Sequence, residues 1–172
     1  VSETGVRYGY AFSTDKTYAT PISRGGIYRY KNLETGTYLT LNSSTNELVL
    51  QDYANSTTQQ WINKLGSEKI MSAHNNLTGG ISIGNQINNK NSKLILSGSP
   101  KNFSRTGWSV STAYGKYGAE RLYTYVGGTS FAISAYNNQA VASSESVLTK
   151  SMHWIIERDF YRNGDANTDG TI

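Results

Sequence analysis

The 172-residue sequence predicts an all-β protein built from three similar units. Composition is the first of three observations that predict this fold class. The chain contains 16 Asn, 21 Ser and 18 Thr beside 17 Gly and 13 Tyr. Hydroxyl and amide side chains favour strands and turns over helix interiors. The other two observations are the spacing of the tryptophans and a repeated alternation of apolar residues.

The tryptophans repeat with a period of about 46 residues. Trp61, Trp108 and Trp154 stand 47 and 46 residues apart. Three short apolar alternations, at residues 39–41, 81–83 and 131–133, stand 42 and 50 residues apart. Two markers with the same mean period indicate an internal repeat.

Each unit contains the same order of short strands. An opening strand is expected at residues 27–30, 70–71 and 122–125, and a glycine-bearing turn leads from it to the alternating strand. A third short strand, such as residues 48–50, and a strand that carries the tryptophan complete the unit. Because one unit cannot bury its own apolar face, we expect the three to pack around a common axis with the tryptophans in a shared core.

The first unit carries a family resemblance. The string GIYRYKNLETGTYLTL (residues 26–41) and the closing Gln59-Gln60-Trp61 resemble the ricin-type β-trefoil, a fold of lectin domains and bacterial carbohydrate-binding modules. The later units keep only the tryptophan, so the core signature is Gln59, Trp61, Trp108 and Trp154. The resemblance implies a β-trefoil of three four-stranded repeats of about 46 residues, over residues 24–162.

The sugar site that the resemblance implies lacks its chemistry here. Galactose-binding relatives use an Asp in the second strand, a stacking aromatic residue and an Asn before the Gln-x-Trp. In the first repeat these positions fall on Thr40, Gln51 and Thr58. In the other repeats the Asp position falls on Ser82 and Ala132. The sequence therefore predicts that the usual galactose site is absent.

Three other groups of aromatic, amide and acidic residues are candidates for carbohydrate binding. An aromatic ring can cover the C–H face of a sugar, and carboxylates and amides can bind its hydroxyls. These groups are Asp52, Tyr53 and Asn55; Tyr136, Asn137 and Asn138; and the pair Tyr114 and Tyr117. Each has a structural alternative: a solvated loop, a hairpin turn of asparagines in the left-handed region, and a cap on the barrel end.

The sequence offers little support for an enzyme. Glu157 and Asp159 share one face of a predicted strand, roughly 7 Å apart, within the range of carboxylate pairs in glycoside hydrolysis. Solvated edge charges are the alternative, and no catalytic motif accompanies them. His153 precedes the core tryptophan on a strand and is expected to point outward.

Both ends lie outside the predicted repeats. Residues 1–23 form an extension or the tail of an upstream module. In the C-terminal stretch 163–172, Asp165, Asn167, Asp169 and the Thr171 carbonyl match the first half of a calcium loop, which stops before its acidic twelfth position. This string resembles the start of a dockerin. The resemblance implies a secreted, modular bacterial protein that binds a cohesin-type partner in a polysaccharide-degrading complex.

Charge and composition exclude several further classes. The net charge of +4 is spread along the chain without a basic stripe, so a nucleic-acid partner is not expected. No apolar run approaches the roughly 20 residues of a membrane helix. The absence of cysteine excludes disulfides, cysteine-ligated metals and thiol catalysis. We expect a monomer whose trefoil needs no cofactor.

The sequence thus predicts a non-catalytic carbohydrate-binding module, with a polysaccharide or glycan as its partner. Loop tyrosines, amides and acids would replace the usual Asp-centred site. The alternative is a protein-interaction or spacer trefoil with no sugar site, which the loss of the usual constellation in all three repeats favours.

Overall fold

The computed structural model describes residues 27–62, 68–74, 78–105 and 118–159, and within these ranges the regular structure is β-strand with two short 3₁₀ turns. The first repeat contains β2 (Ile27–Asn32), β3 (Tyr38–Asn42), β4 (Glu47–Gln51), η2 (Thr57–Gln59) and β5 (Trp61–Ile62). The second contains β6 (Met71–Ser72), β7 (Gly80–Gln86), β8 (Asn91–Ser97) and β9 (Ser104–Arg105). The third contains β10 (Leu122–Val126), β11 (Thr129–Tyr136), β12 (Gln139–Ser144), η4 (Lys150–Met152) and β13 (Trp154–Asp159).

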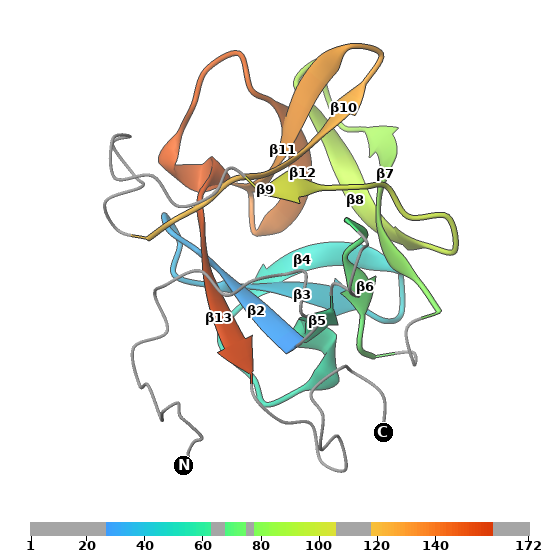
Figure 1. The fold of residues 1–172 in the computed structure, drawn as a ribbon, viewed down its shortest axis with the longest axis vertical. Coiled ribbons are helices and arrows are strands. Elements are labelled where there is room, and N and C mark those ends of the chain that lie inside the picture. Colours follow the sequence, from blue (N-terminus) through green and yellow to red (C-terminus); the bar gives the residue numbers. More distant parts are fainter. Residues whose placement is uncertain (1–26, 63–67, 75–77, 106–117, 160–172) are drawn as a thin grey trace.

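Six of these strands close into a barrel. The strand β13 pairs along its whole length with β2, which also pairs with β5, and β5 pairs with β6 (Figure 1). The bridge between Lys69 and Asn102 continues the ring toward β9, which pairs with β10. A bridge between Glu120 and Trp154 returns the ring to β13.

Three hairpins, β3–β4, β7–β8 and β11–β12, cap the barrel. They join through backbone hydrogen bonds in which a strand amide of one repeat donates to a turn carbonyl of another: Leu50 to Asn138, Leu96 to Asn46, and Ser144 to Lys90, at 2.8–3.3 Å. A closed six-stranded barrel capped by three hairpins in this three-fold arrangement is a β-trefoil. The predicted fold class is therefore confirmed.

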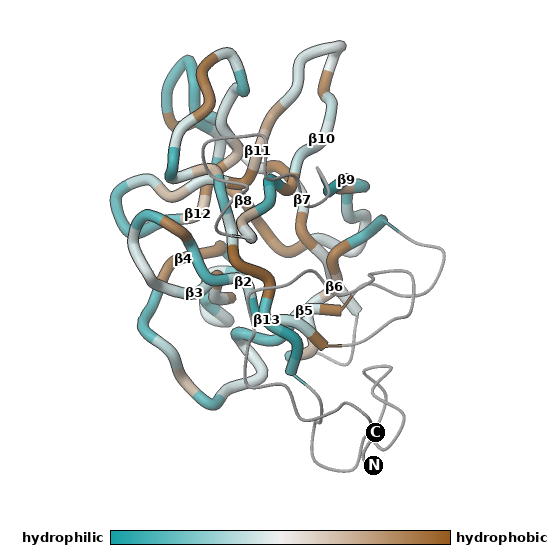
Figure 2. Tube along the Cα trace, turned by 60° about the vertical axis from the view of Figure 1, so that its left-hand side comes forward, coloured by the Kyte–Doolittle hydropathy of each residue, from teal (hydrophilic) through white to brown (hydrophobic). Residues whose placement is uncertain are grey.

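The tryptophans lie in the shared core, as the period predicted. Trp61 and Trp154 are fully buried, and each indole N–H donates to a carbonyl of the second strand of its own repeat: Leu39 at 3.1 Å and Ile133 at 2.7 Å. In Figure 2 the hydrophobic stretches of the strands lie toward the centre and the hydrophilic stretches lie mostly on the turns. Trp108 lies outside the described residues.

The indole bonds also correct one predicted position. They make Ile133 the equivalent of Leu39, so the equivalent of Thr40 in the third repeat is Ser134 rather than Ala132. Side chains of a strand alternate with a period of two, so an alternating pattern fits equally well two residues further along. Ser134 carries a hydroxyl, so the third repeat lacks a carboxylate at this position, as predicted.

Glycines meet two different needs in the turns. Gly127 and Gly128 form the two-residue link between β10 and β11, with φ of 58° and 81°, which is the conformation that a tight hairpin needs. In the second repeat, a Cβ on Gly80 would lie 2.8 Å from the Ile70 carbonyl oxygen, so close packing excludes a side chain there.

His153 corrects another expectation. It is buried, with 4% of its surface exposed, and Nδ1 donates to the Thr149 carbonyl at 2.7 Å. The residue lies at the end of the short turn η4, where the chain has not yet adopted the alternation of β13. No helix in the described ranges has the length and apolar character that a bilayer span requires.

The shared core makes a clear stability prediction. Replacing Trp61 by Ala removes a fully buried ring and leaves the Leu39 carbonyl without its donor. We expect the free energy of unfolding in urea to fall by about 3–5 kcal/mol. Val147→Ala, at a side chain that is 68% exposed, should change it by less than about 0.5 kcal/mol. Similar values for the two variants would contradict a tryptophan-centred core.

Candidate functional site

The loop after β4 is held in place by the side chain of Gln59, the first residue of the Gln-x-Trp signature. Ser56 caps η2 by accepting from the Thr58 amide at 3.2 Å, and this short turn directs Gln59 into the interior, where it is fully buried. Its Nε2 donates to the Asp52 carbonyl at 2.8 Å, and its Oε1 accepts from the Ala54 amide at 2.9 Å. Both ends of this side-chain amide therefore fix the backbone of residues 52–54.

This loop carries Asp52, Tyr53 and Asn55, all three of them exposed, with Tyr53 at 57%. The Tyr53 ring packs edge-on against Tyr38, with ring centroids 5.6 Å apart and an interplanar angle of 79°. The guanidinium of Arg29 lies over the same ring, 4.8 Å from its centroid. These two contacts hold the ring in place while more than half of the Tyr53 surface stays exposed. We call Asp52, Tyr53 and Asn55 the Tyr53 platform.

Arg29 ties the Tyr53 platform to the last strand of the barrel. Although only 4% exposed, it donates from Nε to Asp159 at 3.0 Å and from Nη1 to the Ala54 carbonyl at 2.9 Å. Gln60 donates to the same Asp159 oxygen at 2.8 Å. A buried charge needs such partners, so the guanidinium is fixed where it supports the ring.

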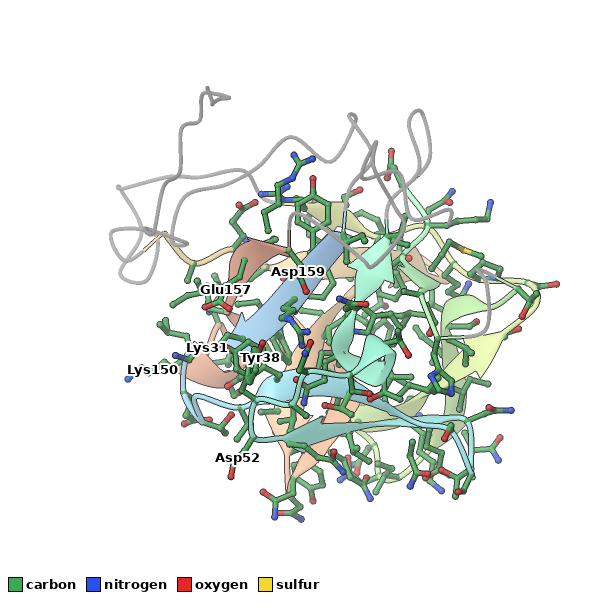
Figure 3. The ribbon with its side chains drawn as sticks, turned by 90° about the horizontal axis from the view of Figure 1, so that it is seen from below. Lys31, Tyr38, Asp52, Lys150, Glu157 and Asp159 are labelled. Atoms are coloured by element: carbon green, nitrogen blue, oxygen red, sulfur yellow. The ribbon has the colours of Figure 1, made fainter. Side chains whose placement is uncertain are left out.

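Tyr38 is held in place by a hydrogen bond to Glu157. Its hydroxyl donates to Glu157 Oε1 at 2.9 Å, and Figure 3 shows Tyr38, Glu157 and Asp159 close together beside β2, with Asp52 farther out. Burial, followed by the hydrogen bond to the Glu157 carboxylate and its charge, raises the pKa of Tyr38 to about 12. The phenol therefore stays protonated and keeps donating at neutral pH.

The carboxylates of Glu157 and Asp159 are both engaged in this network. Glu157 accepts from Tyr38, and Asp159 accepts from Arg29 and Gln60. Their bonds support the ring pair of Tyr38 and Tyr53. These contacts give the two acids a structural role that strand spacing alone did not indicate.

Thr40 stands at the position where the ricin-type resemblance predicts a sugar-binding Asp, and its side chain has a structural role. Thr40 is 2% exposed, donates to the Tyr38 carbonyl at 2.8 Å and accepts from Gln59 Nε2 at 3.1 Å. The hydroxyl of Thr58 is bonded to Ser56 Oγ at 2.8 Å, and Gln51 lies exposed at the end of β4. The hydroxyls of Thr40 and Thr58 are therefore engaged in hydrogen bonds within the protein. None of the three side chains supplies a carboxylate or an aromatic ring.

The second predicted group divides between a turn and a hollow. Asn137 and Asn138 form the β11–β12 turn with φ of 49° and 62°, the left-handed region that asparagine tolerates. Tyr136 is half-buried, and its hydroxyl accepts from Asn88 at 3.4 Å. The turn therefore explains the two asparagines, and Tyr136 contributes to the hollow.

That hollow has a volume of about 240 Å³, and its lining includes hydroxyl and amide side chains beside Tyr136: Asn91, Ser134, Ser143, Ser144, Ser146, Thr149 and Ser151. Several of the hydroxyls bond to one another, as in Ser134 to Ser151 at 3.1 Å and Thr149 to Ser151 at 2.7 Å. Sequence reasoning missed this surface, because its residues are scattered through two repeats and resemble ordinary loop residues.

The remaining predicted residues lie outside the described ranges: Tyr114, Tyr117, Asp165, Asn167, Asp169 and Thr171. Within the described ranges, no three acidic or histidine side chains gather as a metal site.

Comparison with solved structures gives the same fold. No protein-family model and no curated protein matches the chain. A ricin B-like lectin of Macrolepiota procera, solved in complex with lactose, aligns with a TM-score of 0.60 at 15% identity over 86% of this chain and 100% of the lectin. ThreeFoil, a designed three-fold symmetric protein, aligns at 0.57 and 16% over 77% and 98%. SeviL bound to the asialo-GM1 saccharide aligns at 0.55 and 16% over 78% and 98%. At these identities the likeness shows the β-trefoil fold.

The Gln59 contacts predict a local loss of order. In Gln59→Leu the Ala54 amide loses its buried acceptor, so its hydrogen exchange should accelerate by tenfold or more, equivalent to about 1–3 kcal/mol for one lost partner. Gln51→Leu, at the exposed neighbour on β4, is the matched control and should leave Ala54 protected. Unchanged exchange in Gln59→Leu would contradict the assigned role.

The Tyr38 phenol predicts a pH dependence. Its pKa in the folded state is about 12, against about 10 when unfolded, so the unfolded chain releases the proton first and stability falls as pH rises from 10 to 12. Tyr38→Phe should lose less stability over this window. Part of the loss remains, because burial also raises the pKa of Tyr28 and Tyr30. Urea unfolding at pH 9 and pH 11.5 measures the difference, and equal losses would contradict it.

Proposed function

We propose that this chain is a non-catalytic carbohydrate-binding module whose Tyr53 platform binds a polysaccharide or glycan. The observation that carries the proposal is the Tyr53 ring, which is 57% exposed and held by Arg29 and Tyr38, in a loop that also exposes a carboxylate and an amide. Such a ring covers the C–H face of a sugar, while Asp52 accepts from its hydroxyls and Asn55 both donates and accepts.

Preorganisation supports a binding role for this loop. A flexible tyrosine would lose side-chain and loop entropy when it bound a sugar. Here the contacts of Gln59 and Arg29 already fix the loop backbone and the ring. The loop is therefore ordered before a sugar binds, which favours a binding platform over an ordinary solvated surface turn.

The fold supports carbohydrate as the class of ligand. Two of the similar structures are proteins solved with a saccharide, lactose in one and the asialo-GM1 saccharide in the other. In this chain the buried Thr40 stands where the usual site has its Asp carboxylate. We therefore place the first sugar contact on the loop after β4, at Asp52 and Tyr53. The hydroxyl-lined hollow beside Tyr136 is a second contact region for the same ligand class.

The same network argues against hydrolysis. A glycosidase needs one carboxyl group free to protonate the leaving oxygen and a second free to act as base or nucleophile. Both carboxylates of the pair already accept hydrogen bonds from buried or half-buried neighbours. We therefore assign Glu157 and Asp159 to support of the platform.

The cellular setting belongs to the proposal as well. The calcium-loop string at Asp165, Asn167 and Asp169 supports a secreted bacterial modular protein with a cohesin-type partner. In such a loop Thr171 would supply a carbonyl ligand to Ca²⁺.

Affinity electrophoresis tests the proposal. The full chain is run through gels that contain galactomannan, mixed-linkage β-glucan or glycogen, all neutral polymers. We expect at least one to retard it, and Tyr53→Ala to weaken that binding by about threefold to tenfold, as loss of one stacked ring implies. Tyr53→Phe should retain binding. Ile87→Ala, at an exposed apolar side chain that lines neither hollow, is the control and should leave binding unchanged.

Free migration through every neutral polymer, or equal retardation of Tyr53→Ala and the unmodified chain, would contradict the platform. The spacer or protein-interaction trefoil would then be the better account.

A further inference from the structure

A second hollow, of about 480 Å³, lies where the second repeat meets the third, between the β8–β9 loop and β10. Its described lining comes from three segments: Lys69 before β6; Ser99, Pro100, Lys101 and Asn102 between β8 and β9; and Thr124 and Tyr125 on β10. Its size falls within the range of small-ligand sites. It shares no lining residue with the Tyr53 platform.

Backbone pairing fixes the walls of this hollow. Lys69 bridges to Asn102, and β10 pairs with β9 through Leu122 with Arg105 and Tyr123 with Ser104. The loop is also anchored along its length, because the Lys101 amide donates to the Ile81 carbonyl at 3.1 Å and the Phe103 amide to the Glu68 carbonyl at 2.8 Å. A ligand would therefore meet a largely formed site.

The charge of the lining has one sign. Two of the seven described lining residues are lysines and none is acidic. Glu68, the neighbouring acid in sequence, is not part of the lining, and its carboxylate accepts from Ser104 Oγ at 3.0 Å. The described lining therefore contains no carboxylate acceptor of the kind that a neutral sugar would use, and its two lysines make it positively charged.

An exposed aromatic ring completes the lining. Tyr125 is 64% exposed and packs edge-on against Tyr123, with centroids 6.0 Å apart. The Arg121 guanidinium lies 5.9 Å from the centre of the Tyr123 ring and is ion-paired with Glu145, so it holds the ring without adding net charge. An apolar ring beside two ammonium groups and the polar groups of Ser99 and Asn102 suits a ligand with a C–H face, hydroxyls and an anionic substituent.

We infer that this hollow binds an acidic saccharide, whose carboxylate or sulfate group lies between Lys69 and Lys101 and whose ring packs on Tyr125. The site is independent of the Tyr53 platform and differs from it in charge. One chain would thereby bind neutral and acidic sugars at separate surfaces. If this hollow binds no acidic saccharide, the proposed function of the Tyr53 platform stands. If the Tyr53 platform binds no neutral sugar, the inference about this hollow stands.

Affinity electrophoresis of the full chain with two anionic probes tests the inference. Gels contain polygalacturonate or dextran sulfate, with fully methyl-esterified polygalacturonate and neutral dextran as the uncharged counterparts. We expect retardation by at least one anionic polymer that exceeds its uncharged counterpart. Retardation by polygalacturonate alone identifies a carboxylate ligand, by dextran sulfate alone a sulfate ligand, and by both a site that accepts either anion.

Charge-matched variants separate a site from general attraction. The double variant Lys69→Gln/Lys101→Gln should weaken binding by about tenfold or more. The control Lys93→Gln/Lys150→Gln removes two charges from residues outside the lining and should change it less than about twofold. Tyr125→Ala should also weaken binding, while Tyr125→Phe retains it. Urea unfolding of each variant verifies that the fold is kept.

Four outcomes would overturn the inference. The first is no retardation by either anionic polymer. The second is an equal loss in both double lysine variants, which would mean attraction to the net charge alone. The third is unchanged binding in Tyr125→Ala, which would mean that no sugar ring packs on Tyr125. The fourth is equal retardation by single-stranded DNA, which would mean that the hollow binds polyanions without preference for an acidic saccharide.

Discussion

The side-chain amide of Gln59 is the interaction on which the candidate site depends. It lies fully buried between two strands and a loop, and each of its polar atoms is satisfied by a partner that has a further role. Thr40 stands at the position where the sequence resemblance predicts a sugar-binding acid, Ala54 belongs to the loop, and Arg29, which donates to Gln59 Oε1, supports the Tyr53 ring. An amide can donate and accept at once, so it joins these groups without a buried charge of its own.

The fold could be predicted from the sequence because its strongest signals are periodic. Trp61 and Trp154 fill equivalent places since a repeat that cannot bury its own apolar face must share a core with its neighbours. The register within a strand was harder to predict. An alternation of period two fits again after a shift of two residues, and this is why Ala132 seemed to match Thr40 where the indole bond identifies Ser134.

The candidate site could be predicted only in part. Asp52, Tyr53 and Asn55 stood out because an acid, a ring and an amide are adjacent in sequence. The contacts of Tyr38, Arg29 and Asp159 span up to 130 residues, and single residues at such separations leave no local pattern. Likewise Lys69 and Tyr125 become neighbours only through the pairing of barrel strands. The described sites are thus products of topology more than of motif.

The most direct test of the Tyr53 platform is an NMR titration of ¹⁵N-labelled protein with an oligosaccharide from whichever neutral polymer retards it. The platform predicts that the amides of Asp52, Tyr53 and Asn55 shift with a single saturating curve, and that the indole signals of the buried Trp61 and Trp154 stay in place. Shifts confined to other surfaces, with residues 52–55 unchanged at saturation, would contradict the account.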